Sequence, residues 1–342
     1  MIKIENIVRP NILELQPYSS ARDEFSGKDG IFLDANENPF GTLNRYPDPY
    51  QKELKDRLSE LKLVNTDNIF VGNGSDEVID LAFRIFCSPG FDKALTFSPT
   101  YGMYDVSAAI NNVELLKLPL NNEFQIDLEK TKSFLTDSSI KLIFICSPNN
   151  PTGNLIRKTD IEFILNNFNG IVIIDEAYID FAETDSLISL IYKYNNLIVS
   201  QTFSKAWGLA AARVGLAYAN VEIISLYNKV KPPYNISELN QKAALEVLAN
   251  QSDYQKNLNT ILTQKEKLKI ELLEISIVKK IYPSDANFIL IEVDNANDLY
   301  NTLVEQKIIT RNRNKQVNNC IRISVGTPKE NNKLMNVLKN IQ

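Results

Sequence analysis

LIVSQTFSKAWGLAAARVGLAYA, residues 197–219, joins two strand-sized runs through a loop of small residues that carries one lysine and one arginine. Both runs are rich in β-branched and apolar residues, which favour strands. Comparable runs, separated by longer stretches with helical periodicity, precede it at IFV (69–71), ALTF (94–97), VELLKL (113–118), KLIFIC (141–146) and IVIID (171–175). The alternation predicts an α/β domain built on a mainly parallel, seven-stranded sheet.

The residues after 235 follow a different pattern, which predicts a second, smaller domain. A helical connector is expected first, and an α+β segment follows it. Its expected elements are the connector at 236–275, the strands IVKKIYP (277–283), NFILIEV (287–293) and CIRISV (320–325), and helices near 297–306 and 328–340. We expect three parts in all: an N-terminal arm (1–30) packing on a partner subunit or on the small domain, a large domain (31–235) and a small domain (236–342).

Composition excludes several classes of function. The chain has 342 residues, 44% of them hydrophobic, and a net charge of −5, so nothing suggests a nucleic-acid partner. We find no signal-peptide core and no run of membrane-spanning length. Three scattered cysteines argue for a reducing compartment, so we expect a cytoplasmic protein. The chain contains no histidine, which removes histidine triads and histidine metal sites, and we expect no metal.

Polar motifs follow several of the predicted strands, at the edge of the sheet where ligands bind in this fold class. GNGSDE (72–77) opens a predicted helix, and Gly74, Ser75 and Asp76 could hold a phosphate at its N-terminus. An ordinary glycine turn before a helix is the more common explanation of such a motif. SPNNPTG (147–153) is either a simple loop or a means of presenting the amide of Asn150 to a ligand.

The acidic motif DEAY (175–178) also follows a buried strand. It resembles the metal-binding acid of a P-loop ATPase, but the required GxxxxGK[ST] segment is absent, as is the GxGxxG of a nicotinamide enzyme. Asp175 could instead pair with a cationic ring nitrogen. Lys205 could extend to solvent, or it could be a desolvated nucleophile toward carbonyls. With Ser204 and Arg213 nearby, the set matches the aldehyde, ring and phosphate of pyridoxal phosphate.

The chain resembles type I-fold, pyridoxal-phosphate-dependent aminotransferases, and the histidinol-phosphate aminotransferase family most closely. The similarity extends over nearly the whole chain, in the family's order. It is carried by LQPYSSAR (15–22), LDANENPFG (33–41), RYPDP (45–49), GNGSDE (72–77), PTYGMY (99–104), CSPNNPTG (146–153), DEAY (175–178), FSKAWGLAAARVG (203–215), KPPYN (231–235), ANF (286–288) and IRISVGT (321–327).

The resemblance implies a role for each matched position around the cofactor. Lys205 would hold pyridoxal phosphate as a Schiff base and shuttle a proton, while Asp175 would pair with the ring nitrogen and Tyr178 would complete the catalytic set. Tyr46 would reach the cofactor phosphate of a partner subunit, which implies a homodimer with shared active sites. The remaining cofactor contacts would come from Gly74, Ser75, Asp76, Tyr101, Asn150, Ser204 and Arg213.

The resemblance also implies the substrates, L-histidinol phosphate with 2-oxoglutarate or glutamate. Tyr18, Asn36, Arg311 and Arg322 would bind them, and an arginine fork suits both carboxylate and phosphate. A solvated basic cluster is the alternative for both arginines. An aromatic or broad-range aminotransferase and a phospho-amino-acid decarboxylase would share every cofactor residue. A cofactor-binding regulator would need a DNA-binding module, for which the residues before 33 leave too little room.

Overall fold

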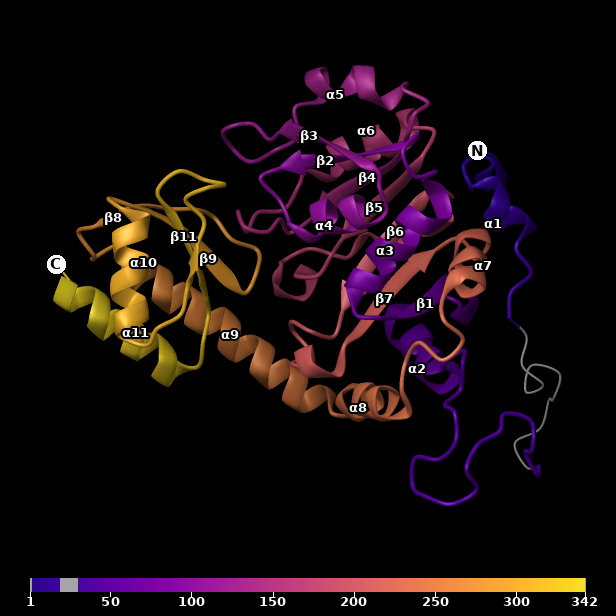
Figure 1. Ribbon diagram of the computed structural model, residues 1–342. Helices are drawn as coiled ribbons and strands as arrows, with labels where there is room; N and C mark the ends of the chain where they lie inside the picture. Colours follow the sequence, from indigo (N-terminus) through magenta and orange to yellow (C-terminus); the bar gives the residue numbers. More distant parts are fainter. Residues whose placement is uncertain (1, 19–29, 342) are drawn as a thin grey trace.

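The computed structural model describes residues 2–18 and 30–341. Within these residues the large domain contains a seven-stranded sheet with the strand order β1-β7-β6-β5-β4-β2-β3 (Figure 1). β7 runs antiparallel to its neighbours β1 and β6, and the other pairs are parallel. This confirms the expected mainly parallel sheet. The strands are β1 (Ile69–Asn73), β2 (Lys93–Ser98), β3 (Glu114–Pro119), β4 (Ile140–Cys146), β5 (Ile171–Asp175), β6 (Leu197–Thr202) and β7 (Val214–Ala219).

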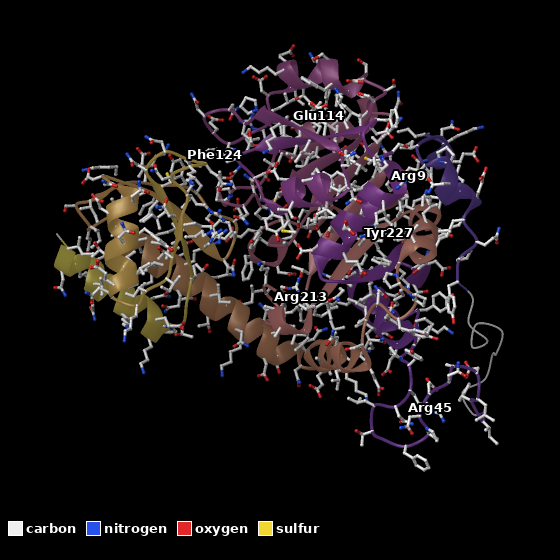
Figure 2. The ribbon with its side chains drawn as sticks, in the orientation of Figure 1. Arg9, Arg45, Glu114, Phe124, Arg213 and Tyr227 are labelled. Carbon is white, nitrogen blue, oxygen red and sulfur yellow. The ribbon has the colours of Figure 1, made fainter. Side chains whose placement is uncertain are left out.

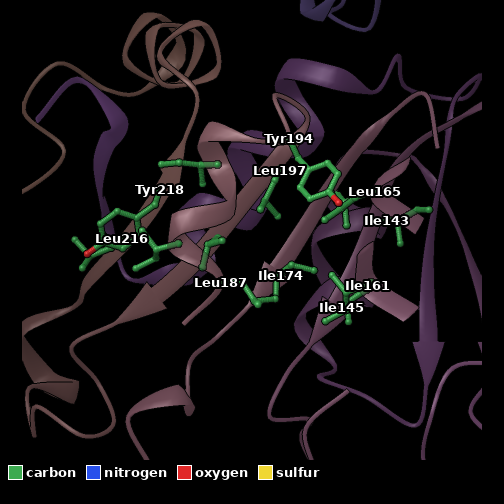
Figure 3. Close-up of a cluster of buried hydrophobic side chains, with 14 of the residues drawn as sticks. Ile143, Ile145, Ile161, Leu165, Ile174, Leu187, Tyr194, Leu197, Leu216 and Tyr218 are labelled. Atoms are coloured by element: carbon green, nitrogen blue, oxygen red, sulfur yellow. The ribbon is translucent and has the colours of Figure 1, made fainter. Parts of the chain in front are cut away.

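Helices cover both faces of the sheet, because successive residues of a strand point to opposite faces. In β5, Ile171 and Ile173 contribute to one core, and Val172 and Ile174 contribute to the other. Figure 3 shows part of the second core, where Ile174 lies near Ile145, Ile161 and Leu187. The first face carries α3 (Ser75–Phe86), α4 (Met103–Ile110) and α7 (Val221–Val230); the second carries α2 (Lys52–Lys62), α6 (Lys158–Asn167) and α8 (Glu238–Ala249).

The small domain follows α9 (Gln251–Leu272), a long helix that connects the two domains in Figure 1. Its antiparallel sheet has the order β10-β11-β9-β8. The longer strands and the helices α9, α10 and α11 confirm the expected pattern, but α8, expected within the small domain (236–342), packs on the large sheet. β10 was missed because RNRNK has no apolar alternation. The elements are β8 (Val278–Ile281), β9 (Phe288–Val293), α10 (Ala296–Glu305), β10 (Arg311–Asn312), β11 (Cys320–Ser324) and α11 (Pro328–Ile341).

The first residues of the expected arm differ from the prediction. They form η1 (Ile4–Asn6) and α1 (Pro10–Glu14), and they pack on the large domain of their own chain rather than on the small domain. The physical reason is a helical spacing of apolar side chains that the polar composition obscured: Ile4, Ile7, Val8 and Ile12 are all buried. Arg9 Nη1 also donates to the carbonyl oxygen of Arg84, at 2.9 Å. Residues 19–29 lie outside the described residues.

The described residues contain neither a membrane-spanning helix nor a metal-binding cluster. None of their helices combines the length and apolar character needed to cross a membrane. They also contain no cluster of cysteine and acidic side chains arranged to bind a metal ion. The three cysteines Cys87, Cys146 and Cys320 are buried and unpaired.

The core of the sheet predicts a large effect of truncation at Ile174. Ile174 is fully buried, so Ile174→Ala leaves a cavity and should lower the free energy of unfolding by about 2–5 kcal/mol. Ile270→Ala is the matched control, because Ile270 is 64% exposed on α9 and should change stability by no more than about 0.5 kcal/mol. Thermal unfolding of both variants measures the difference. Equal losses would contradict the burial argument.

Candidate active site

A cleft lies where polar loops follow the carboxyl ends of β1, β4, β5 and β6. Parallel strands end at one edge of a sheet, so the motifs that follow them meet there. The cleft contains eight of the predicted site residues. The structure adds Cys146, Ala177 and Thr202, which sequence reasoning did not select. The complete lining is Ser75, Asp76, Tyr101, Cys146, Asp175, Ala177, Tyr178, Thr202, Ser204, Lys205 and Arg213.

One end of the cleft has the features of an anion site. α3 begins at Ser75, and its N-cap, Gly74, supplies no side-chain cap, so the first N–H groups of the helix remain available. Gly74 has a φ of +76°, and a Cβ there would lie 2.6 Å from Arg213 Nη2. Glycine is therefore required for the arginine to approach the turn. Arg213 Nη2 also donates to Asp76 Oδ2 at 3.1 Å, which fixes the guanidinium at this end.

The other end carries a buried acid. Asp175 Oδ2 accepts from Tyr104 Oη at 2.8 Å, and Asp175 Oδ1 accepts from the backbone N–H of Ala177 at 3.1 Å. Burial raises the pKa of Asp175, so a nearby cation would strengthen its ionised form. Tyr104 was missed by the sequence analysis, although Tyr101 and Tyr104 are spaced to share a helical face. Their rings meet edge to face, and Tyr101 Oη donates to Asp76 Oδ1 at 3.2 Å.

Lys205 lies between these two ends, with Nζ 5.4 Å from the centre of the Tyr178 ring. Burial, and then the positive charge of Arg322, lower the pKa of the lysine and favour the neutral, nucleophilic amine. Burial likewise raises the pKa of Tyr178, which keeps its hydroxyl protonated. Asn150 Nδ2 donates to Tyr178 Oη at 3.4 Å. An amide and a phenol therefore face the lysine together.

The small domain contributes arginines. Arg322, on β11, donates through Nη1 to Asn150 Oδ1 of the large domain, and its guanidinium lies 5.0 Å from the centre of the Phe288 ring. The register of the sheet pairs Arg311 with Arg322. Arg313 is half-buried beside them and was not predicted as a site residue. Arg322 is thus held at the edge of the cleft by Asn150, Arg313 is half-buried, and Arg311 is exposed.

Seven predicted residues lie outside this lining. Gly74 and Asn150 adjoin it through Arg213 and Tyr178, and Arg322 reaches Asn150, with Arg311 paired to it on the small sheet.

The other three lie away from the cleft of their own chain. Tyr46 stacks on Tyr234, with 4.4 Å between the ring centres. Asn36 lies with Tyr46 along one surface hollow, and Tyr18 lies in a different one. The segment that carries Asn36 and Tyr46 extends away from the large domain, as the position of Arg45 shows (Figure 2).

The groups in the cleft fit pyridoxal phosphate. The amine of Lys205 suits its aldehyde, the buried Asp175 suits its ring nitrogen, and the amide and phenol of Asn150 and Tyr178 suit its ring oxygen. The glycine turn before α3, with Arg213, suits its phosphate. The side chain of Asp76 binds Arg213 and Tyr101, so Asp76 positions these two residues and offers its backbone N–H to an anion.

Known proteins share this fold and sequence. A family model described as aminotransferase class I and II matches residues 28–338. The histidinol-phosphate aminotransferase of Cytophaga hutchinsonii is 51% identical over 343 residues, covering 98% of each chain. That of Parabacteroides distasonis is 50% identical over the full length of both chains.

Solved structures of histidinol-phosphate aminotransferases have a similar fold. The histidinol-phosphate aminotransferase from Clostridium acetobutylicum has a TM-score of 0.80 at 26% identity, covering 87% of this chain and 91% of its own. The one from Sinorhizobium meliloti, in complex with pyridoxal 5'-phosphate, has a TM-score of 0.80 at 22% identity, and the match covers 90% of each chain. This similarity shows a common fold.

The charge next to Lys205 predicts a change in pH dependence. Arg322→Gln removes a cation that lowers the pKa of Lys205, so the pKa rises and less neutral amine is present at any given pH. The rate at which the cofactor-free protein takes up pyridoxal phosphate, followed by absorbance over a pH series, should therefore shift to higher pH. Arg157→Gln is the control, because Arg157 is exposed and pairs with Glu123. An unchanged midpoint in Arg322→Gln would contradict the argument that the charge of Arg322 lowers the pKa of Lys205.

Proposed function

The chain belongs to the aminotransferases of class I and II, and we propose that it transfers an amino group between L-histidinol phosphate and 2-oxoglutarate in histidine biosynthesis. The products are imidazole-acetol phosphate and L-glutamate. Its cofactor is pyridoxal phosphate. Full-length relatives with about half of their residues identical, all named for this activity, support the choice of substrate. One observation carries the proposal: a desolvated lysine lies between a buried carboxylate and a cluster of arginines.

The residues of the cleft divide the chemistry among them. When bound, pyridoxal phosphate supplies an electron sink for the carbanion formed at the substrate α-carbon. Lys205 Nζ would hold the cofactor through its aldehyde, and as a free amine it would take the proton from that carbon. Asp175 would keep the ring nitrogen protonated, which makes the ring a stronger electron sink. Lys205 suits proton transfer because its pKa is lowered and because the chain has no histidine.

The arginines hold the substrate. Arg322 lies against Asn150 and near Lys205, so it can bind the α-carboxylate of glutamate while the amine reaches the reactive centre. Histidinol phosphate has no carboxylate, and its phosphate must use the same basic cluster, in which Arg311 is the outer member. This explains how one cleft can accept two donors of different shape.

We further propose that the protein is a cytoplasmic homodimer with shared sites. The segment 30–46 displays Ile31, Leu33 and Phe40 at 92%, 88% and 82% exposure, a large apolar surface for a monomer. Glu37 fixes the segment internally, accepting from Arg45 Nη1 and from the backbone N–H of Tyr46, both at 2.6 Å. A preformed segment of this kind can deliver Tyr46, and with it Asn36, to a partner's cleft. The buried, unpaired cysteines support a reducing compartment.

The choice of substrate predicts a spectral response of the purified holoenzyme. Histidinol phosphate should bleach the visible absorbance of the bound cofactor, and 2-oxoglutarate should restore it, because the amino group moves onto the cofactor and off again. Lys205→Ala should abolish both changes. Bleaching by phenylalanine but not by histidinol phosphate would indicate a broad-range aminotransferase. Release of CO₂ from threonine phosphate would indicate a decarboxylase.

Sharing of sites predicts complementation between two defective chains. Tyr46→Ala should weaken cofactor binding, and Lys205→Ala should be inactive. In a mixed dimer, the Lys205→Ala chain donates an intact Tyr46 to the intact Lys205 of the other chain, which restores one complete site. Co-expression with two different tags, followed by cofactor titration and activity assay, measures this recovery. Failure to recover in a verified mixed dimer would contradict shared sites, and a monomer by sedimentation would contradict the dimer.

A further inference from the structure

The small sheet presents three arginines on the face opposite its own core. Ile321 and Ile323 lie in the hydrophobic core of the small domain, so the alternation along β11 directs Arg322 to the other face. Arg311 is paired with Arg322, and it therefore lies on the same face. The backbone N–H of Arg313 donates to the carbonyl oxygen of Cys320 at 2.9 Å, which continues the pairing and brings Arg313 to that face as well.

No acid neutralises this cluster within the described residues. None of the three guanidinium groups has a carboxylate within 4.0 Å there. The Nε atoms of Arg313 and Arg322 are buried and have no hydrogen-bond partner in the described part of the chain. Glu292 lies on the same face by register, opposite Cys320, but its Oε2 accepts from Tyr282 Oη at 3.1 Å. The cluster therefore holds an excess of positive charge and unused donors.

The unfavourable electrostatic energy of this excess positive charge falls mostly on Arg313. Burial, followed by the charges of Arg322 and Arg311, lowers its pKa to about 10. Partly buried like charges are unfavourable unless an anion compensates them. A carboxylate on Arg322 would bring one negative charge, whereas a phosphate monoester brings nearly two and three acceptor oxygens. The cluster matches the phosphate better than the carboxylate.

The order of the charges along the cleft separates two anion positions. Arg322 contacts Asn150 and lowers the pKa of Lys205, whereas Arg313, whose own pKa is lowered by Arg322, acts on Tyr178. In glutamate, the carboxylate is bonded directly to the amino-bearing carbon. In histidinol phosphate, a methylene and an oxygen separate the phosphorus from that carbon. A phosphate therefore extends further from the reacting carbon than a carboxylate does.

We infer that Arg313 selects donors carrying a phosphate monoester, and that Arg322 alone suffices for the carboxylate of glutamate. This inference rests on the proposed function for the identity of the phosphorylated amine. It assigns a specificity role to a residue in the loop between β10 and β11. Arg313 acts by binding the remote end of the substrate and takes no part in proton transfer.

The test measures the two half-reactions separately in the holoenzyme. Arg313→Gln should lower kcat/KM for histidinol phosphate by about 10- to 100-fold, the usual effect of losing a hydrogen bond to a charged group. The glutamate half-reaction should change by less than about threefold, which also shows that the variant is folded. Arg313→Lys should recover part of the loss because it keeps the charge. Lys315→Gln is the matched control, since Lys315 is exposed in the same loop and its replacement makes the same charge change.

Inorganic phosphate provides a second measurement that does not depend on the amine. Phosphate should inhibit the glutamate half-reaction of the parent enzyme, and Arg313→Gln should raise the inhibition constant about 10-fold or more. If the parent enzyme does not accept histidinol phosphate, the proposed function fails, and this measurement still decides the role of Arg313. Equal losses in both half-reactions, an unchanged inhibition constant, or the same loss in Lys315→Gln would each overturn the inference.

Discussion

The parallel pairing of β4, β5 and β6 is the constraint on which the site depends. Cys146 lies opposite Asp175, and Asp175 lies opposite Ser200, so the three strands reach the same edge nearly in register. The pairing continues into the loops, where the backbone N–H of Ser147 donates to the backbone carbonyl oxygen of Asp175 at 2.9 Å. An amide, an acid and a lysine that are distant in sequence consequently meet in one cleft. The buried, two-sided strands make this register difficult to change, because a shift by one residue would reverse both cores.

The electrostatic asymmetry of the cleft follows from that arrangement. The acid lies at the buried end of β5, while the arginines come from the residue before β7, Arg213, and from the small domain. Lys205, between them, experiences desolvation and positive charge, and both lower its pKa. The same residues thus generate a nucleophile and an anion site, without a metal ion or a histidine being required by the donor set.

Sequence reasoning was effective where pattern and burial coincide. The strands of the large sheet were predicted because their runs are apolar, and the cofactor residues were predicted because each follows such a run. It failed where the role of a residue depends on contacts between distant parts of the chain. Tyr104 lies in PTYGMY, but nothing in that motif shows that its hydroxyl reaches Asp175 from a helix on the sheet face. Arg313 lies in a polar segment, and its burial follows from a pairing too short to show periodicity. The buried N-terminal helix was concealed by its polar neighbours.

Two contacts join the loops of the large domain to α9 and to the small domain. Trp207, close to Lys205 in sequence, stacks on Tyr254 of α9 with 3.9 Å between ring centres. Arg322 reaches Asn150 from the other side of the cleft. Because α9 connects the domains, a rotation of the small domain would disturb the stack and the arginine contact together. Arg322 uses Nη1 for this contact and keeps other donors for an anion, since its Nε has no partner in the described residues. One side chain therefore belongs both to the contact between the domains and to the anion-binding side of the cleft.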